Sequence, residues 1–194
     1  MPRNSRLISG DKRMHKPAES GFALADVIRE RWSPMAFSAR PIAPEILGSL
    51  FEAARWAASS FGEQPWAFCV ATQDQPTEFA AMLRCLMEAN QQWARHASAL
   101  VISCAKLNLT RNDQPNRYAY HDVGLATQNL ILQAMSHGIY SHPMGGFDRE
   151  QARAVLQIPE SHEAVAAIAI GYPAEDLAKL NDSLRERQLA ARTR

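Results

Sequence analysis

The sequence lacks a long apolar run and lacks an excess of charge of either sign. None of its apolar stretches reaches the roughly 18 residues that a membrane-spanning helix requires, and the N-terminus has no signal-peptide core. Lysine and arginine number 21 against 20 aspartate and glutamate, a formal net charge of +1. That balance gives no electrostatic reason to expect binding to nucleic acid or to a membrane. We therefore expect a cytoplasmic protein that binds neither.

Cysteine is also scarce, with three residues and no metal-binding spacing among them. Cys69 and Cys104 fall in apolar, strand-like stretches and Cys85 in a helical one, which favours buried, reduced thiols. The spacing of His121, His137 and His142 does not enforce convergence, so we expect no metal site.

The familiar short catalytic and nucleotide-binding motifs are missing as well. The chain contains no GxGxxG, P-loop, HExxH, CxxC or GxSxG pattern. Nothing in it indicates acid–base or covalent chemistry carried by protein side chains. If the protein is an enzyme, a cofactor must supply the reaction.

The length and composition are those of one ordinary globular domain. The chain has 194 residues, of which 46% are hydrophobic and 21% charged. We divide it into a polar N-terminal arm (1–20), one domain (21–175) and a basic tail of that domain (176–194). The arm is expected to be mobile or to wrap a partner, and the tail to form a solvated helix.

The most apolar helical pattern begins near His121 and ends at Gly138, which can adopt the left-handed conformation that closes a helix. Its apolar residues point in several directions, so this helix should be buried on most sides. Periodicity also predicts helices over about 21–31, 44–58, 77–96 and 147–156, and strands over 66–71, 99–104 (central in the sheet) and 165–170.

Three connecting segments carry residues suited to ligand binding. Arg31 and Ser33 at a helix end could hold an anion, although a surface arginine beside a capping serine is commoner. Residues 59–66 are rich in small and hydrogen-bonding side chains, which also suit an ordinary helix-to-strand turn. Residues 143–146 (PMGG) could let a flat ligand approach the backbone, or could simply form a turn.

Together these segments resemble the nitroreductase family of FMN-dependent oxidoreductases, in the family's order. Residues 31–37 (RWSPMAF) resemble its RRSxRxF element, and residues 59–66 (SSFGEQPW) its PSSxNxQPW loop. Residues 122–130 (DVGLATQNL) are similar to its central helix. Residues 143–148 (PMGGFD) resemble its flavin-facing loop, and residues 171–173 (GYP) its terminal strand.

The resemblance implies an α+β fold with a mixed, mostly antiparallel sheet wrapped by helices. It also implies an intertwined homodimer, with an FMN site at the interface and NAD(P)H as electron donor. The phosphate and ribityl chain would be held by Arg31 and Ser33, with backbone contacts from Trp32, and a basic pair near the C-terminus would complete the phosphate site. The serine loop (residues 59–66) would come from the other subunit. The PMGG loop (residues 143–146) would cover one face of the flavin and place a backbone N–H near its N5 atom. The residues implied are Arg31, Trp32, Ser33, Met35, Ser59, Ser60, Gly62, Gln64, Pro143, Met144, Gly145, Gly146, Arg192 and Arg194.

The chain departs from the family pattern at Ala58, which replaces the proline of the loop, and at two positions beside the flavin. Met35 stands where a lysine or arginine usually approaches the pyrimidine edge of the flavin, and Gly62 stands where an asparagine usually binds that edge. Both losses should leave a negatively charged reduced flavin less stabilised.

The resulting functional prediction is a reductase that acts by a ping-pong mechanism on a small organic acceptor, such as a nitroaromatic or a quinone. Trp93, residues 106–117 and Tyr118 or Tyr120 would form the substrate walls. Two alternatives remain open at this stage. One is a specialised flavin enzyme of the same family (flavin-fragmenting, dehalogenating or dehydrogenating), and the other is a non-catalytic flavin-binding dimer.

Overall fold

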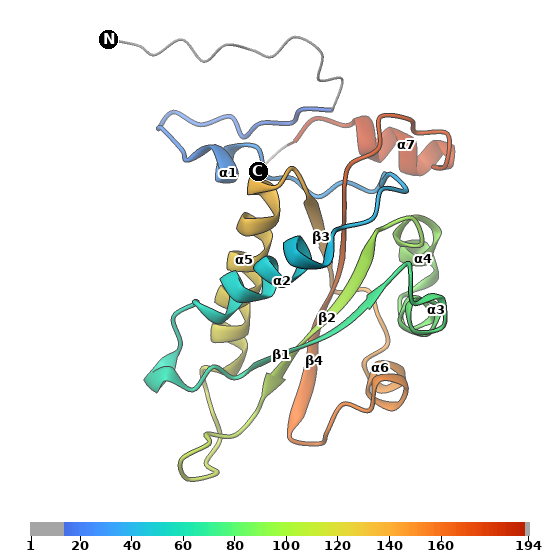
Figure 1. Ribbon diagram of the computed structural model, residues 1–194. Coiled ribbons are helices and arrows are strands. Elements are labelled where there is room, and N and C mark those ends of the chain that lie inside the picture. The colour runs from blue at the N-terminus through green and yellow to red at the C-terminus, as the bar shows by residue number, and fades with distance from the viewer. Residues whose placement is uncertain (1–13, 193–194) are drawn as a thin grey trace.

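A four-stranded antiparallel sheet forms the centre of the computed structural model, which describes residues 14–192 (Figure 1). The strands are β1 (Trp66–Thr72), β2 (Ala99–Lys106), β3 (Tyr140–Met144) and β4 (His162–Gly171), in the order β1-β2-β4-β3. Each neighbouring pair is antiparallel. The predicted α+β fold is confirmed, and the strand at 99–104 is central as expected.

The last strand alternates small and large side chains, and the two sets belong to different cores. Ala167 and Ala169 face one core, whereas Ile168 and Ile170 face the other. Successive side chains of a strand point to opposite faces, so this alternation makes the sheet apolar on both sides. Both faces therefore require a covering layer.

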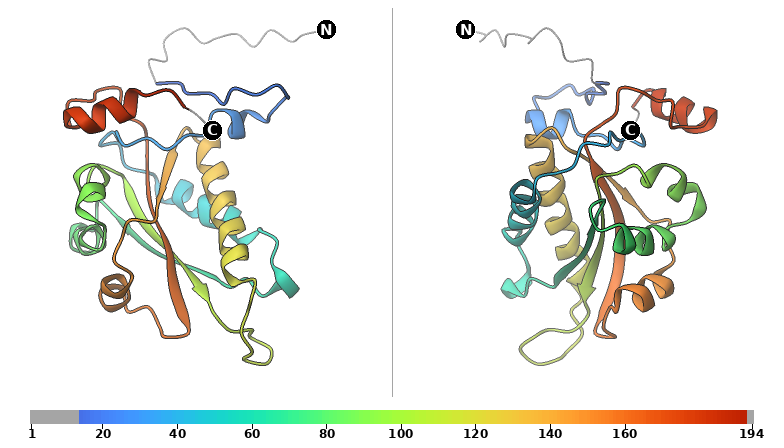
Figure 2. Two further views of the ribbon diagram at one scale, coloured as in Figure 1. Left: turned by 180° about the vertical axis from the view of Figure 1, so that it is seen from behind. Right: turned by 45° about the vertical axis from the view of Figure 1, so that its right-hand side comes forward.

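Helices cover the two faces of the sheet in unequal ways (Figure 2). Helices α2 (Pro44–Arg55) and α5 (Ala119–Ser136) pack on the face with the isoleucines. Three shorter helices, α3 (Pro76–Arg84), α4 (Glu88–Ala94) and α6 (Arg149–Leu156), cover the face with the alanines. The alanines leave room on that side for large aromatic side chains from these helices and loops.

Helix α5 is the predicted apolar helix, and it ends as expected. Gly138 has a φ of 68°, the left-handed conformation that follows many helix C-termini. Leu130 and Ala134 are fully buried, but Leu125 is 38% exposed, so one flank of α5 is open in the single chain. No helix between residues 14 and 192 has both the length and the apolarity to cross a bilayer.

The prediction of one helix over 77–96 is wrong in one respect, because the structure has two helices there, α3 and α4. Residues 85–87 leave the helix to bond the segment after β3. The Cys85 carbonyl accepts from the Asp148 N–H at 2.8 Å, and the Met87 N–H donates to the Gly146 carbonyl at 3.0 Å. These tertiary hydrogen bonds replace helical ones and override the local periodicity.

The helix predicted over 21–31 is also largely wrong. Only α1 (Asp26–Arg29) forms, and it buries no side chain. Ser20 accepts the Phe22 N–H at 3.1 Å in a turn instead of capping a helix. Without an apolar face to bury, a longer helix here gains too little from packing.

Sequence reasoning missed strand β3, which it treated as part of a loop. Pro143 and Met144 pair with Ile168 and Ala167 of β4. Because β3 lies at the edge of the sheet, it tolerates the proline, whose missing N–H would weaken a central strand.

The tail does form a helix, α7 (Asp182–Leu189), but it is not simply solvated. Leu184 and Gln188 are buried, and the Gln188 Oε1 accepts the Met35 N–H at 2.8 Å. Figure 1 shows α7 at the same end of the molecule as α1 and the N-terminal segment. This helix therefore brings the end of the described chain close to residues 31–37, which we call the first motif.

Candidate functional site

A strongly basic cavity lies where three distant segments of the chain meet. It has a volume of about 240 Å³ and is lined by Lys16, by Arg31 of the first motif, and by Arg187 and Arg192 of the C-terminal segment. No acidic side chain lines it. Four cations around one small cavity repel one another, so the arrangement favours an anionic ligand.

The first motif is held in place by burial on one side of this cavity. The Trp32 ring is buried and meets the Tyr140 ring edge-on, with 6.0 Å between centroids. Met35 is buried as well, with its N–H bonded to Gln188. These contacts fix the backbone on either side of Ser33. The Ser33 Oγ accepts a hydrogen bond of 3.3 Å from Arg31 Nη1, which holds both polar groups at the cavity.

The two ends of the described chain close the cavity from the opposite side. The Lys16 ammonium donates to the carbonyls of Gln188 and Ala190 and lies 4.9 Å from the centre of the Trp32 ring. Partial burial lowers the pKa of Lys16. Arg192 Nη1 donates to the carbonyls of Lys16 at 3.2 Å and Arg29 at 2.9 Å. Backbone carbonyls thus position these cations without neutralising their charge.

One buried donor in the cavity wall has no acceptor. The Trp32 Nε1–H is inaccessible to solvent and has no hydrogen-bond partner anywhere in residues 14–192. An unpaired buried N–H costs free energy, so native structures rarely retain one without a bound acceptor. The guanidinium, ammonium and hydroxyl donors around the cavity fit a phosphate group.

The structure brings together most of the residues predicted to hold a phosphate. Arg31, Trp32, Ser33 and Arg192 all line this cavity, and so does Met35, which was predicted to lie at the pyrimidine edge of the flavin instead. Arg194, the second predicted C-terminal arginine, lies outside the described residues. Sequence reasoning did not find Lys16 or Arg187. Lys16 belongs to the N-terminal arm that the sequence predicts to be mobile or to wrap a partner. No sequence signal distinguishes Arg187 from the other arginines of the tail.

The serine loop has a strained backbone with specific anchors. Phe61, Gly62 and Gln64 all have positive φ values, of 53°, 67° and 47°. The Ser59 Oγ accepts the Gln64 N–H at 3.1 Å. The Ser60 N–H donates at 2.9 Å to the carboxylate of Asp122, a residue only 2% exposed. The loop is therefore tied to the first turn of α5.

Within one chain the serine loop and the basic cavity lie at opposite ends of α5. Asp122 holds the loop at the first turn, whereas Tyr140 packs on the cavity wall just after the last turn. A helix of 18 residues is about 27 Å long. Figure 1 shows the loop, at the start of β1, far from α1 and α7. The two predicted groups of residues do not meet within a single chain.

The two glycines after β3 have different structural roles. Gly145 is exposed, and a Cβ added there would meet no atom within 4 Å. A Cβ at Gly146 would lie 2.7 Å from Asn90 Nδ2, which donates to the Gly146 carbonyl at 2.9 Å. Gly146 is therefore needed for packing against α4, and Gly145 is the one that leaves the backbone open to a ligand.

Trp93 cannot serve as a predicted substrate wall, because only 1% of its surface is exposed. Its ring stacks on Phe37 with 6.3 Å between centroids and packs at a tilt of 31° against His142 with 4.4 Å between centroids. His142 donates from Nδ1 to the Pro34 carbonyl at 2.9 Å. Burial lowers the pKa of His142, the Pro34 bond opposes that shift, and the nearby cations of Arg187 and Arg31 lower the pKa further.

The other predicted substrate walls lie near the serine loop. The segment 106–117 is a small hairpin with a bridge between Asn108 and Pro115, and the Thr110 N–H donates to Glu63 at 2.8 Å. Tyr118 and Tyr120 remain partly exposed. These residues are at the same end of α5 as Ser59 and Ser60 and are far from the basic cavity.

Comparison with known proteins gives consistent matches. A model of the nitroreductase family matches residues 28–172, which include the first motif and the serine loop. A crystal structure of an oxidoreductase containing FMN superposes with a TM-score of 0.84 at 32% identity, covering 90% of this chain and 89% of that one. A candidate NADH dehydrogenase/NAD(P)H nitroreductase of Archaeoglobus fulgidus is 31% identical over 77% of this chain and 85% of its own length. The 4-nitrobenzoate reductase of Pseudomonas putida is 24% identical over 84% of this chain and 91% of its own.

The lowered pKa of His142 gives a pH prediction. Its folded-state pKa is below the value of about 6.5 for a free histidine. The unfolded state therefore binds more protons below that pH, and the free energy of unfolding should fall as pH decreases from 7.5 to 5.5. His142→Gln should lose less stability over this interval in urea unfolding. His137→Gln, which removes an exposed histidine, is the control, and an unchanged pH dependence in His142→Gln would contradict the prediction.

Proposed function

The chain belongs to the nitroreductase family, and from that premise we propose that it is an FMN-dependent oxidoreductase that uses NAD(P)H to reduce a small organic acceptor. The observation that carries the proposal is the basic cavity at the first motif. Its four basic side chains and the Ser33 hydroxyl suit the phosphate of a nucleotide cofactor. A crystallised relative that superposes on this chain with a TM-score of 0.84 is described as containing FMN.

Each group in the cavity has a proposed task. Arg31 and Arg192 would bind the phosphate oxygens through guanidinium N–H groups, and Ser33 would donate its hydroxyl to the phosphate or ribityl chain. Lys16 is already held by two backbone carbonyls. It would therefore contribute positive charge to the cavity rather than a flexible hydrogen bond to the ligand. Met35 contributes an apolar wall without a positive charge.

FMN, when bound, would supply the redox chemistry by accepting a hydride from NAD(P)H and passing electrons to the acceptor. The chain would position it and limit access of water. Gly145 supports the proposed approach of a backbone N–H to the flavin, since no side chain blocks that position. A nitroaromatic or a quinone is the proposed acceptor class, with donor and acceptor using the same cleft in turn, and the 4-nitrobenzoate reductase of Pseudomonas putida supports the first.

We further propose that the flavin site forms between two copies of the chain. The serine loop with Ser59, Ser60 and Gln64 cannot reach the basic cavity of its own chain, because α5 separates them. A two-fold axis would place the loop of one copy beside the cavity of the other. Exposed aromatic side chains at both ends support such contact. They are Trp56 (73% exposed) and Phe61 (76%) at the loop end and Phe22 (86%) at the cavity end.

The proposed activity is tested by the absorbance spectrum of the purified protein, loaded with FMN and mixed anaerobically with NADPH or NADH. We expect oxidised-flavin bands that bleach, followed by their return when a nitroaromatic or quinone is added. Bands that persist would favour the specialised or non-catalytic alternatives instead. A protein that takes up no FMN would contradict the proposal.

The phosphate-binding role is tested by comparing FMN with riboflavin, which lacks the phosphate. Arg192→Ala should weaken FMN binding by about ten- to a hundredfold, because a hydrogen bond to a charged group contributes roughly 1.5–3 kcal/mol. Riboflavin affinity should not change. Arg84→Ala, an exposed arginine at the end of α3, is the matched control. Equal losses for both flavins would show that Arg192 acts through the fold and not on the phosphate.

The shared site is tested by mixing two defective subunits. One carries Arg31→Ala with Arg192→Ala, and the other carries Ser60→Tyr, which fills the loop but leaves the backbone bond to Asp122 intact. Each variant alone should bind FMN poorly. In a mixed dimer, one site combines the altered cavity with the altered loop, and the other site combines the unaltered cavity with the unaltered loop. Co-expressed heterodimers should therefore bind about one FMN per dimer. No recovery in purified heterodimers would mean that the site does not cross the interface.

A further inference from the structure

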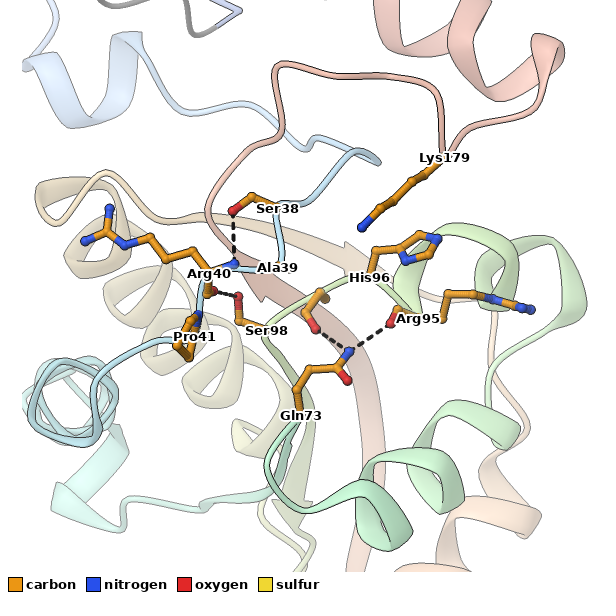
Figure 3. A pocket seen from close by; sticks show the side chains of 10 residues that line it. Ser38, Ala39, Arg40, Pro41, Gln73, Arg95, His96, Ser98 and Lys179 are labelled. Carbon is orange, nitrogen blue, oxygen red and sulfur yellow. Dashed lines mark hydrogen bonds between the residues drawn. The ribbon is translucent and has the colours of Figure 1, made fainter.

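A second basic cavity lies on a different part of the surface, with a volume of about 260 Å³ (Figure 3). Its lining includes Arg40, from the segment after the first motif, Arg95 and His96 at the end of α4, and Lys179, before α7. It contains no acidic side chain and shares no lining residue with the cavity at Arg31. The proposed flavin site does not use any of these residues.

The backbone that carries these basic groups is fixed by hydrogen bonds from side chains in the cavity wall. The Ser98 Oγ donates to the Arg40 carbonyl at 2.8 Å. The Gln73 Nε2 donates to the carbonyls of Arg95 at 2.8 Å and Ala97 at 3.0 Å. Figure 3 shows the two Gln73 bonds meeting at its amide nitrogen and the Ser98 bond beside Pro41. The backbone of Arg40 and of residues 95–97 is therefore held in place before any ligand binds.

The positive charges of Arg40, Arg95 and Lys179 are not neutralised by ion pairs among the described residues. Within residues 14–192, no carboxylate pairs with Arg40, Arg95 or Lys179. Arg40 lies over the Tyr172 ring at 3.8 Å, and Arg95 Nε donates to the Gln91 carbonyl at 3.0 Å. Figure 3 shows the Lys179 amine near the His96 ring, whereas the guanidinium groups of Arg40 and Arg95 extend outward on opposite sides of the cavity.

The electrostatics of His96 agree with this geometry. Burial lowers the pKa of His96, and the positive charges of Lys179 and Arg95 lower it further. The cavity thus concentrates positive potential on one imidazole. A bound anion would relieve the repulsion between these groups and would reverse the effect of the two cations on the imidazole.

We propose that this second cavity binds a phosphate-type dianion, either inorganic phosphate or the phosphate group of a monoester. Lys179 supplies an ammonium and His96 a ring N–H at the centre of the cavity. Arg40 and Arg95 add positive charge at its rim, and their guanidinium groups would contact the anion only by leaving the Tyr172 ring and the Gln91 carbonyl. Charge-assisted donors of this kind bind tetrahedral oxyanions well. The cavity volume admits one such group.

The test is the pKa of His96, measured by NMR of the imidazole ring protons in the full-length, FMN-loaded protein after all unbound FMN has been removed. The resonance is assigned with His96→Gln. Inorganic phosphate should raise the pKa of His96 relative to sodium chloride at equal ionic strength. Because His96 reports only on the second cavity, the result does not depend on whether FMN binds at the first. A His96 pKa that phosphate leaves unmoved would overturn the proposal.

The lysine variant adds a quantitative arm to this test. Lys179→Met should raise the pKa of His96 in chloride, because it removes a nearby positive charge, and should weaken phosphate binding by about tenfold. Lys106→Met removes a cation at the end of β2, away from the cavity, and should change neither value. Equal effects of the two substitutions would show that phosphate acts through overall charge and not at this site, which would overturn the proposal.

A second probe distinguishes the two sources of the phosphate group. Adenosine 2′-monophosphate is titrated beside inorganic phosphate, with adenosine as the uncharged control. Tighter binding of the nucleotide would assign the cavity to an organic phosphate ester, and tighter binding of inorganic phosphate would assign it to the free ion. Equal shifts with adenosine alone would contradict recognition of an anion.

Discussion

The burial of helix α5 determines most of the architecture. Its apolar face lies on Ile168 and Ile170 of β4 and is closed by α2, so the helix cannot tilt away from the sheet without exposing that core. A straight helix of 18 residues then separates whatever its two ends hold. At one end Asp122 binds the serine loop, and at the other Tyr140 packs against Trp32. The need for a second chain in the proposed site follows from this single rigid spacer.

The basic cavity shows how a fold can keep like charges together. Lys16 and Arg192 each bind backbone carbonyls, which orient the cations but leave their net charge in place. The resulting repulsion is offset by the burial of Trp32, Met35 and Leu184 around them. In such an arrangement the ligand contributes to the stability of the folded state by mass action, because the unfolded chain offers no comparable site.

Sequence reasoning succeeded where local pattern and tertiary structure agree. The apolar alternation of β4, the closure of α5 by Gly138 and the family segments all led to the observed fold. It failed where a tertiary contact overrode the pattern, as at residues 85–87, and where an edge strand contained Pro143. The resemblance singled out Arg31, Ser33 and Arg192, which the structure brings to one cavity, and their role in cofactor binding stays a prediction. It could not find Lys16, because its role depends on a contact with residues more than 170 positions away.

That contact has a consequence for the order in which the molecule assembles. The Lys16 ammonium meets the Ala190 carbonyl across a sequence separation of 174 residues. Closing so long a loop carries a large entropic cost unless the intervening chain is already compact. The walls of the basic cavity should therefore come together late in folding, after the sheet and α5 have formed. A nascent or partly folded chain would have no place to capture a nucleotide, and competence for binding would mark the completion of the fold.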